Sequence, residues 1–342
     1  MPMEPYVRNL WYVAAWEDEV PEGGMLPRTL LDEPRLIYRL ADGTYAALAD
    51  RCPHRFAPLS RGKRDGDRIV CGYHGLEFGA DGGCVRDPFS DLIPPNTQVS
   101  SWPTEARWGA VWVWPGDAAA TDPALIPDFS FIDAGPPIVR GRTHMRANFE
   151  FITDNLMDLS HAEFLHIETF ATNGALFNGE HSATQDDSGA IWSNWRMPDT
   201  PPPPFATALV PDGGRVDQWL EMRWHAPASM ALFIGVAHAG SERQQMVVPA
   251  MANPHIITPE TATSSHYFFT REPGDGSEAM AKQVFDAEDG PMLEAIQQAM
   301  LGRDFWAERP VILSVDAAAI RARRRLMQLR RSEMPSPVEV AA

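Results

Sequence analysis

Two short clusters of cysteine and histidine constrain this chain more than any other feature of its sequence. Cys-Pro-His at 52–54 and Cys-Gly-Tyr-His at 71–74 each offer one thiol and one imidazole, and 16 residues separate them. A Rieske [2Fe–2S] centre needs this contribution from each of two loops, because two histidines replace two cysteines on one iron. Structural zinc is an alternative, but its ligand pairs usually stand about two to four residues apart. A second alternative is that these cysteines and histidines are ordinary buried residues that bind no metal. The spacing favours the [2Fe–2S] centre, with the ligands Cys52, His54, Cys71 and His74.

The composition limits the partners and the compartment of the protein. With 29 basic and 46 acidic residues the formal net charge is −17, which argues against nucleic acid and anionic membranes as partners. Three cysteines occur, and Cys84, the one outside the clusters, cannot build a disulfide framework. We interpret it as a small buried apolar residue. The apolar run at 10–16 is too short for a signal peptide or a membrane span. We therefore expect a protein of the reducing cytoplasm.

The first third of the chain alternates short apolar runs with turn residues, a pattern typical of antiparallel strands and hairpins. Between Gly116 and Pro137 the residues Ala, Asp and Pro dominate and the periodicity lapses, which indicates a domain boundary. We place the two domains at residues 1–118 and 119–342. The runs expected to form strands in the first domain are residues 10–16, 29–31, 35–38, 45–48, 76–78 and 110–115.

An amphipathic helix is predicted over residues 148–166, because apolar residues recur there at helical spacings. Asp154, Asp158 and His161 share one polar stripe of this helix. His166 follows five residues after His161, about 140° further round an ideal helix. For both imidazoles to reach one metal ion, the helix must end or distort between them.

His161 and His166 are candidate ligands of a mononuclear iron. Two histidines and one carboxylate form the facial triad of non-haem Fe(II) oxygenases, which leaves positions open for O2 and substrate. An electron carrier in the same chain favours this interpretation over ordinary surface histidines. The spacing leaves the carboxylate open: Asp154 or Asp158 is either a ligand or the acceptor of a hydrogen bond from a ligand imidazole.

The rest of the chain mixes strands and helices. Prolines 201–204 form a stiff connector, with a lid over a pocket as the alternative. The arginine-rich helix at 316–331 is interpreted as a solvated basic face, and docking of an acidic partner is the alternative. The expected strands are residues 191–196, 219–224, 230–236 and 266–269.

A second helical pattern, over residues 278–301, is interrupted at Gly290-Pro291, since proline removes a helix hydrogen bond. Asp286, Glu288 and Asp289 stand just before the break. A carboxylate can turn inward at such a place.

Three motifs are similar to the signatures of Rieske non-haem iron oxygenase α subunits. They are Cys-Pro-His-Arg at 52–55, Cys-Gly-Tyr-His-Gly at 71–75, and Asp-Asn-Leu-Met-Asp-Leu-Ser-His at 154–161 followed by His166. Within that group the chain most resembles the aromatic O-demethylases of the vanillate demethylase and dicamba monooxygenase type. The resemblance covers nearly the whole chain, and further matches lie at residues 8–14, 111–117, 235–240 and 258–261.

The resemblance implies an α+β protein with an N-terminal Rieske [2Fe–2S] antiparallel β domain and a C-terminal helix-grip (START/Bet v 1-like) catalytic domain. It also implies a head-to-tail homotrimer that carries a [2Fe–2S] cluster and a mononuclear Fe(II). A separate reductase or ferredoxin would deliver electrons from NAD(P)H, so that the nicotinamide acts only indirectly.

Residue roles follow from the same resemblance. Asp158 matches a bridging aspartate that would link His74 of one subunit to His161 of the next. Asp289 matches the ligand carboxylate, although spacing alone does not choose it over Asp286. Asn155 matches an asparagine with a supporting role near the iron.

The substrate contacts are inferred in the same way. His255 aligns with a substrate-contacting histidine of the dicamba enzyme, but Leu232 stands where that enzyme has an asparagine, which argues against dicamba itself. An apolar pocket for an aromatic acid is expected. The residues expected to line it are Phe151, Leu156, Phe170, Leu232, Ile234 and His255, with core packing as the alternative role for each of them.

The implied activity is that of an O2-dependent monooxygenase that O-demethylates a methoxylated, vanillate-like aromatic acid and releases formaldehyde. The same residues would also serve hydroxylation of a ring, or oxidation of an N-methyl, methyl or sulfonate substituent. An alternative of another class is a non-catalytic electron-transfer protein with a Rieske centre.

Overall fold

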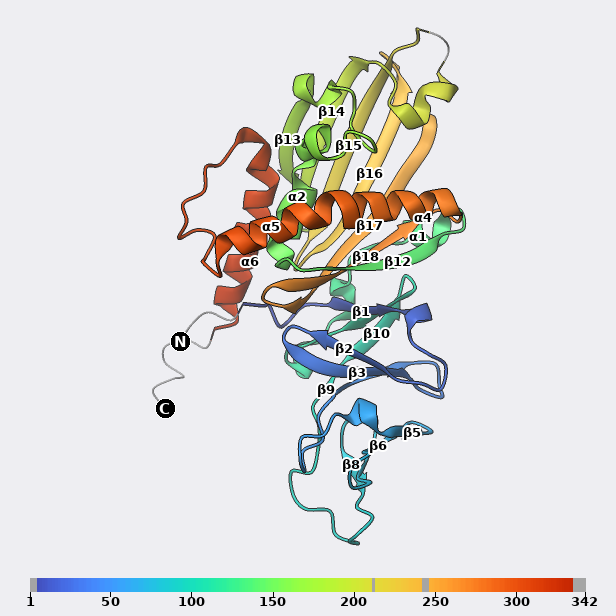
Figure 1. Cartoon of the computed structure of the whole chain (residues 1–342), viewed down its shortest axis with the longest axis vertical. Helices are drawn as coiled ribbons and strands as arrows, with labels where there is room; N and C mark the ends of the chain where they lie inside the picture. Colours follow the sequence, from blue (N-terminus) through green and yellow to red (C-terminus); the bar gives the residue numbers. More distant parts are fainter. Residues whose placement is uncertain (1–4, 211–212, 242–245, 335–342) are drawn as a thin grey trace. The chain divides into compact units, whose positions relative to one another are not determined.

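The chain forms two units with different secondary structure (Figure 1). The computed structural model describes residues 5–210, 213–241 and 246–334. The first unit holds the described residues up to Pro127 together with 258–262 and 333–334, and the second holds the others. The units divide after Pro127, whereas the sequence places the boundary after residue 118. The limit of the independently folding domains stays a prediction.

Three small antiparallel sheets make up the first unit. Each of the six apolar runs predicted there overlaps a strand. The strands, in their order within each sheet, are β1 (Tyr12–Trp16), β11 (Ala110–Val113) and β10 (Thr104–Arg107); β2 (Leu26–Leu30), β3 (Glu33–Arg39), β4 (Tyr45–Ala49) and β9 (Ser101–Trp102); and β5 (Lys63–Asp65), β6 (Arg68–Val70), β7 (Glu77–Phe78) and β8 (Cys84–Arg86).

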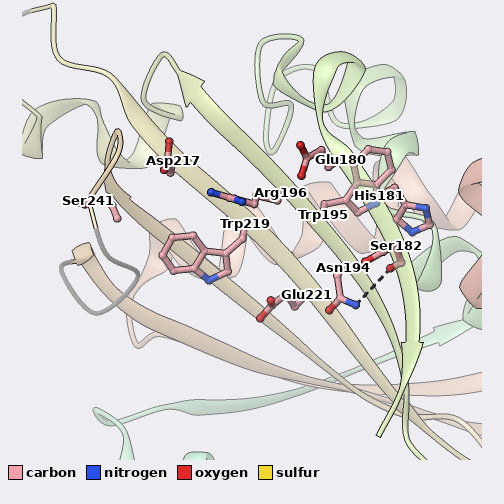
Figure 2. A pocket seen from close by; sticks show the side chains of 11 residues that line it. Glu180, His181, Ser182, Asn194, Trp195, Arg196, Asp217, Trp219, Glu221 and Ser241 are labelled. Atoms are coloured by element: carbon pink, nitrogen blue, oxygen red, sulfur yellow. Dashed lines mark hydrogen bonds between the residues drawn. The ribbon is translucent and has the colours of Figure 1, made fainter.

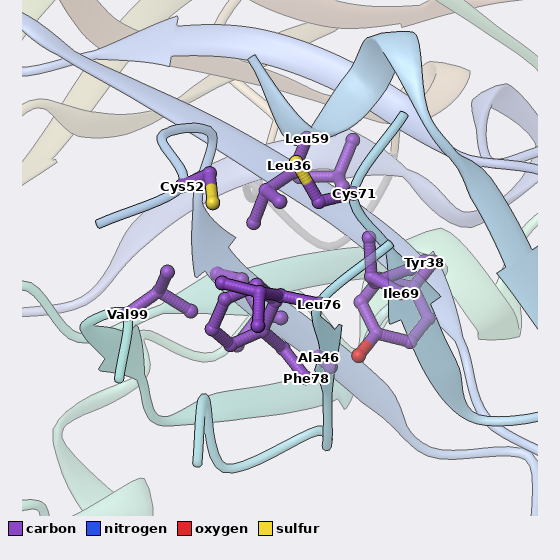
Figure 3. Close-up of a cluster of buried hydrophobic side chains, with 11 residues drawn as sticks. Leu36, Tyr38, Ala46, Cys52, Leu59, Ile69, Cys71, Leu76, Phe78 and Val99 are labelled. Carbon is purple, nitrogen blue, oxygen red and sulfur yellow. The ribbon is translucent and has the colours of Figure 1, made fainter. Parts of the chain in front are cut away.

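An apolar cluster in the first unit encloses two cysteines (Figure 3). Each large apolar side chain that is fully buried contributes about 1.5–3 kcal/mol. The cluster anchors the loops that follow β4 and β6, and Cys84 packs half-buried against it. Its buried members are Leu36, Tyr38, Ala46, Leu48, Cys52, Leu59, Ile69, Cys71, Leu76, Phe78 and Val99.

A seven-stranded antiparallel sheet forms the centre of the second unit (Figure 1). A continuous helical run crosses it: α4 (Asp275–Ala281), a π-helix (Lys282–Asp289) and α5 (Gly290–Met300). The short helix α1 (Phe131–Ala134) precedes the sheet, and α2 (Phe149–Met157) packs against α6 (Ala317–Ser332). The strand order is β12 (Val139–Met145), β18 (Ser264–Arg271), β17 (Met246–Thr261), β16 (Ser229–His238), β15 (Val216–His225), β14 (Ile191–Thr200) and β13 (Glu180–Gln185).

In the second unit, strands β12, β13 and β17 coincide with none of the four runs that the sequence predicts as strands. The central strand β17 contains Pro254 and Pro259, and proline is normally confined to sheet edges and bulges because it lacks an N–H donor. The pairing of β16 with β17 is regular at Pro254, which lies opposite Ala231, and its register shifts twice further along, between Ile234 and Ala237. Within the three described ranges, no helix is long and apolar enough to cross a membrane.

The arginine-rich helix α6 is not a uniformly solvated face. Arg323 is 5% exposed and Arg330 is 9% exposed, and both pair with Glu150 of α2. Arg323 also donates to Asp154 and stacks on the ring of Phe305, with 3.9 Å from Cζ to the ring centroid. The predicted basic face is therefore wrong for these two arginines, which instead tie α6 to α2.

Candidate metal centres

The two cysteine loops of the first unit share one backbone hydrogen-bond pattern. Each cysteine N–H donates to the carbonyl five residues on (2.9 Å for Cys52 and 2.8 Å for Cys71). Each cysteine carbonyl accepts from the N–H four residues on (2.9 and 3.0 Å), and that residue, Phe56 or Gly75, has a positive φ of 60° or 75°. Glycine adopts this conformation without strain, whereas phenylalanine seldom does. The sequence thus folds into two matched turns.

These turns bring the two predicted cysteine ligands close to each other and the two predicted histidine ligands close to each other. Cys52 and Cys71 are 2% and 3% exposed, and their thiols lie close enough for Cys71 to contribute to the raised pKa of Cys52. Burial raises the pKa of the Cys52 thiol, and a metal would bind it as the thiolate. The rings of His54 and His74 lie with their centroids 4.5 Å apart. Two buried thiols and two adjacent imidazoles fit the donor set of a Rieske cluster.

In the second unit, helix α2 ends before the chain reaches the two candidate iron ligands. Asp158 has non-helical dihedrals (φ −114°, ψ 88°), and its Oδ1 accepts from the N–H and O–H of Ser160 (3.0 and 2.6 Å). It therefore caps the 3-10 turn Leu159–His161, and His166 follows the short helix α3 (Ala162–Leu165). The helix predicted over 148–166 is therefore interrupted at Asp158, and the change from the 3-10 turn to α3 between His161 and His166 confirms the distortion expected if both imidazoles reach one metal.

Three side chains bring potential metal ligands together here. His161 Nε2, His166 Nε2 and Asp289 Oδ1 lie within 4.8 Å of one another. The two Nε2 atoms are 3.3 Å apart, and Asp289 Oδ1 lies 3.7 Å from His161 Nε2 and 3.3 Å from His166 Nε2. Because such ligand atoms lie about 2.1 Å from a bound metal, all three can reach one ion. Two imidazoles and a carboxylate are the donor set of a facial Fe(II) triad.

Asp289 reaches this position from the π-helix. The Gly290 N–H donates to the Phe285 carbonyl five residues back, which is the hydrogen bond of this wider helix. A Cβ at position 290 would lie 2.8 Å from that carbonyl oxygen, so glycine is required. Pro291 follows in the first turn of α5, and because it has no N–H, one carbonyl of the preceding π-helix lacks its usual helix hydrogen bond. The predicted interruption is thus a change of helix type, not a break.

Two acids that the spacing left open lie away from the triad. Asp286 Oδ1 accepts a hydrogen bond from Thr143 Oγ1 (2.7 Å). Asp154 pairs with the buried Arg323 at 2.7–2.9 Å, so the prediction that Asp154 ligates the metal or supports a ligand histidine is wrong.

Glu288 is hydrogen-bonded to Nδ1 of His166, on the opposite side of the ring from Nε2, and the sequence patterns did not predict this role. Its Oε2 lies 2.6 Å from His166 Nδ1 and accepts from Thr169 Oγ1 (2.8 Å), while Oε1 accepts from Gln283 (3.1 Å). Burial alone would raise the Glu288 pKa, but these hydrogen bonds outweigh it and the pKa is lowered. The pKa of His166 is raised against the effect of burial, because Asp289 and Glu288 flank it. A carboxylate on Nδ1 leaves Nε2 free to face a metal.

Groups on α2 and the turn after it orient the other two ligands. His161 Nδ1 lies 2.5 Å from the backbone carbonyl of Asp158, so the backbone and not the carboxylate of Asp158 orients this ring. Burial lowers the pKa of His161, which favours the neutral imidazole that binds metal. Asn155 Nδ2 donates to Asp289 Oδ1 (3.2 Å), and the predicted asparagine therefore contacts the candidate carboxylate.

The predicted substrate contacts lie on the face of the sheet against which the π-helix packs. Pairing of β16 with β17 places Leu232, Ile234 and His255 on one face, because alternate residues of paired strands share a face. Phe285 of the π-helix packs against that face, with its ring centroid 6.3 Å from that of His255.

The other pocket candidates are more scattered. Leu156 is buried in α2, and Phe151 lies under the guanidinium of Arg323. Phe170 is 47% exposed, with its ring centroid 6.4 Å from that of His166.

A cavity of about 630 Å³ lies over strands β13 to β16 (Figure 2), and none of the three triad residues lines it. Trp219 and Glu221 line it, and they alternate along β15 with Leu220 and Met222, which pair with Ile234 and Leu232. Most of the cavity therefore lies on the opposite face of the sheet from the predicted substrate contacts. A second cavity, of about 480 Å³, is lined by Ser160, Phe164 and Phe177 beside the Asp158 turn. We place the chemistry at the triad because the converging ligands are there.

Known proteins match both units. The family model of the Rieske [2Fe-2S] domain matches residues 10–102, and that of the vanillate O-demethylase oxygenase C-terminal domain matches residues 145–332. The oxygenase component of dicamba O-demethylase from Stenotrophomonas maltophilia is 38% identical and aligns over 96% of this chain and 99% of its own. The oxygenase component of chloroacetanilide N-alkylformylase from Rhizorhabdus wittichii is 35% identical, over 98% and 99%.

The crystal structure of dicamba monooxygenase bound to dicamba superposes with a TM-score of 0.84 at 38% identity, covering 96% of this chain and 98% of that one. The fold and the two sites define an oxidoreductase that works with a [2Fe–2S] cluster and a non-haem iron. The chain belongs to the Rieske non-haem iron oxygenases, in the group of the vanillate and dicamba O-demethylase oxygenase components. The relatives are components of oxygenase systems, so the alternative of a non-catalytic electron-transfer protein is set aside.

Proposed function

We propose that the protein O-demethylates a methoxylated, vanillate-like aromatic acid and releases formaldehyde. The observation that carries the proposal is the convergence of His161, His166 and Asp289 next to a sheet face that bears apolar side chains and one buried histidine. The 38% identity with a dicamba O-demethylase component supports removal of a methyl group from oxygen.

In this proposal each residue set has one task. The bound metals supply electron storage and the activation of O2 for oxidation of a C–H bond. Glu288 keeps His166 Nε2 directed at the metal, and the Asn155 amide holds the carboxylate of Asp289. The cluster ligands are Cys52, His54, Cys71 and His74, and the iron ligands are His161, His166 and Asp289.

The protein orients the substrate so that a methoxy C–H bond faces the triad, and the apolar side chains of Leu232 and Ile234 exclude water. Oxidation of the methoxy carbon gives a hemiacetal, which collapses to formaldehyde and a phenol. One atom of O2 enters the formaldehyde and the other leaves as water, with two electrons and two protons consumed. His255 contacts the substrate from the same sheet face.

We also infer a head-to-tail trimer in which Asp158 links His74 of one subunit to His161 of the next. The carbonyl of Asp158 already orients His161, and among the described residues its carboxylate accepts hydrogen bonds only at Oδ1, which leaves Oδ2 for a partner. Apolar side chains stand exposed near both ends of this link: Tyr73 beside His74, and Phe164, Ile167 and Phe177 near His161. An interface between copies would cover them.

A separate reductase or ferredoxin supplies the electrons from NAD(P)H. The names of the relatives support this, because each is the oxygenase component of a larger system. The three free cysteines suit the reducing cytoplasm as the compartment.

A second candidate is removal of an N-alkyl group from a neutral aromatic amide. The 35% identity with a chloroacetanilide N-alkylformylase component over 98% of this chain supports it. Leu232 supports it too, because an apolar side chain there suits a neutral substrate.

The decisive experiment is a substrate panel with the reconstituted enzyme. We would incubate the iron-loaded protein, a reductase and NADH with methoxybenzoates and with N-alkoxymethyl anilides, and assay formaldehyde and the aromatic product. Formaldehyde formed from a methoxybenzoate only when O2 and reductase are present supports the proposal. A protein that contains zinc and no iron, or one that turns over only the anilides, refutes it.

A further inference from the structure

His255 and Tyr267 form a buried pair next to the candidate iron site. His255 Nδ1 lies 2.5 Å from the hydroxyl oxygen of Tyr267, and the two residues are 9% and 1% exposed. Phe285 of the π-helix covers the pair, with ring centroids 4.8 Å from Tyr267 and 6.3 Å from His255. The carboxylate of Asp289 is close enough for its charge to act on both groups.

The two possible arrangements of protons in this pair leave different groups unpaired. If the histidine donated to the tyrosine oxygen, both the tyrosine O–H and the lone pair of His255 Nε2 would be buried without a partner, because His255 is the hydrogen-bond partner of Tyr267 among the described residues. If the tyrosine donates, its O–H is satisfied, Nδ1 uses its lone pair, and only the Nε2–H of His255 is left without a protein partner. The second arrangement is favoured because it leaves fewer buried polar groups unpaired.

Both groups have the protonation state that this arrangement needs. Burial raises the pKa of Tyr267 well above its usual value, so the hydroxyl keeps its proton. Burial lowers the pKa of His255 to about 4, so the imidazole is neutral near pH 7. A neutral imidazole that accepts at Nδ1 carries its proton on Nε2.

The Nε2 atom of His255 is buried and has no hydrogen-bond partner in the described part of the chain. Its neighbours on the same face of the sheet include the apolar Leu232 and Ile234. A donor that is fixed in direction and lacks a protein acceptor, beside the triad, is placed to bind an acceptor atom of a ligand.

We propose that Tyr267 is a positioning residue that fixes the Nε2–H tautomer of His255 and thereby selects aromatic substrates with an oxygen acceptor, such as a carboxylate or a carbonyl. The substrate class rests on the proposed function, whereas the tautomer does not. The role of Tyr267 is to hold this donor, and Tyr267 itself does not contact the reacting atoms.

The test combines a direct measurement of the tautomer with matched ligands. ¹⁵N NMR of the full-length, histidine-labelled protein with zinc at the mononuclear site reads the tautomer of His255, identified by the signal that is lost in His255→Gln. We expect Nε2–H in the unaltered protein and a mixture of tautomers in Tyr267→Phe, which keeps the aromatic packing. Nδ1–H in the unaltered protein, or no change in Tyr267→Phe, would overturn the proposal.

Binding of 3-methoxybenzoate and 3-methoxytoluene to the holoenzyme, measured by calorimetry, tests the selection. Tyr267→Phe should weaken binding of the acid about tenfold and that of the toluene less than about twofold, since only the acid accepts the hydrogen bond. Tyr12→Phe, which removes a buried hydroxyl bonded to the Val7 carbonyl in the other unit, is the matched control and should change neither. Equal weakening for both ligands refutes the selection. If the tautomer holds but no methoxybenzoate yields formaldehyde, the proposed function fails and the positioning role stands.

Discussion

Replacing Glu288 tests whether a carboxylate behind His166 supports metal binding. Its Oε2 lies 2.6 Å from His166 Nδ1, and the side chain is 10% exposed. Loss of such a supporting carboxylate weakens metal binding about 10- to 100-fold, or about 1.4–2.7 kcal/mol. For Glu288→Ala we expect a loss of metal affinity near the upper end of this range, because His166, Thr169 and Gln283 all lose their hydrogen-bond partner. Glu288→Gln belongs near the lower end, because the amide keeps an acceptor oxygen but loses the charge.

Anaerobic titration of Fe(II) into full-length protein that lacks only its mononuclear iron measures this affinity. The absorbance of the [2Fe–2S] cluster reports that the first unit is intact. Glu278→Gln is the matched control, because Glu278 also pairs with cations, Lys282 and Arg271, but at the surface of α4. We expect it to change the affinity less than about twofold. Fe(II) binding in Glu288→Ala as tight as in the unaltered protein would refute the reasoning.

Three further predictions concern the link, the fold and the pH dependence. Asp158→Ala should keep both metals by elemental analysis yet abolish turnover, and Asp158→Asn, which keeps the cap on Ser160, should also be inactive; full activity in either would contradict the bridging role. Arg323→Met should lower the free energy of unfolding of the second unit in urea by about 3 kcal/mol, because it leaves the partly buried Asp154 unpaired while Glu150 keeps Arg330 as a partner, whereas exposed Arg324→Met should cost less than about 0.5 kcal/mol. Between pH 6.5 and 5 the unfolded chain protonates His255 while the folded protein, with a His255 pKa of about 4, does not, so stability should fall by about 2 kcal/mol through this residue. Urea unfolding at both pH values should show a smaller loss in His255→Gln, and an equal loss would rule this contribution out.

The cluster site could be predicted from sequence because all of its information is local. Each cysteine stands two or three positions from its histidine, and the turns that present them depend on a few neighbouring residues. The strands around them follow from alternation of apolar side chains. Nothing distant in the chain was needed to identify this site.

The carboxylate of the triad could not be predicted from spacing, and the reason is the π-helix. Helical patterns assume about 3.6 residues per turn, and that assumption fails over the turn that carries Asp286, Glu288 and Asp289. Only the family resemblance selected Asp289. The role of Glu288 was hidden for the same reason, although two adjacent acids before Gly-Pro were a visible signal.

The buried arginines show another limit. Arginine is seldom buried unless it is paired, and the partners of Arg323, Glu150 and Asp154, lie about 170 positions earlier in the chain. The spacing of seven residues between Arg323 and Arg330, on the face that also buries Leu326, was the only local hint. Pairing across such a distance is a tertiary property that one helix does not reveal.

The π-helix that carries Asp289 makes the metal site sensitive to the deletion of a single residue. A π-turn differs from an α-turn by one extra residue, so deleting a single residue within Lys282–Asp289 would restore a regular α-helix at little structural cost. The same deletion would change the register of Glu288 and Asp289 together and withdraw both carboxylates from His166. One deletion would therefore remove both the third metal ligand and the carboxylate that orients His166.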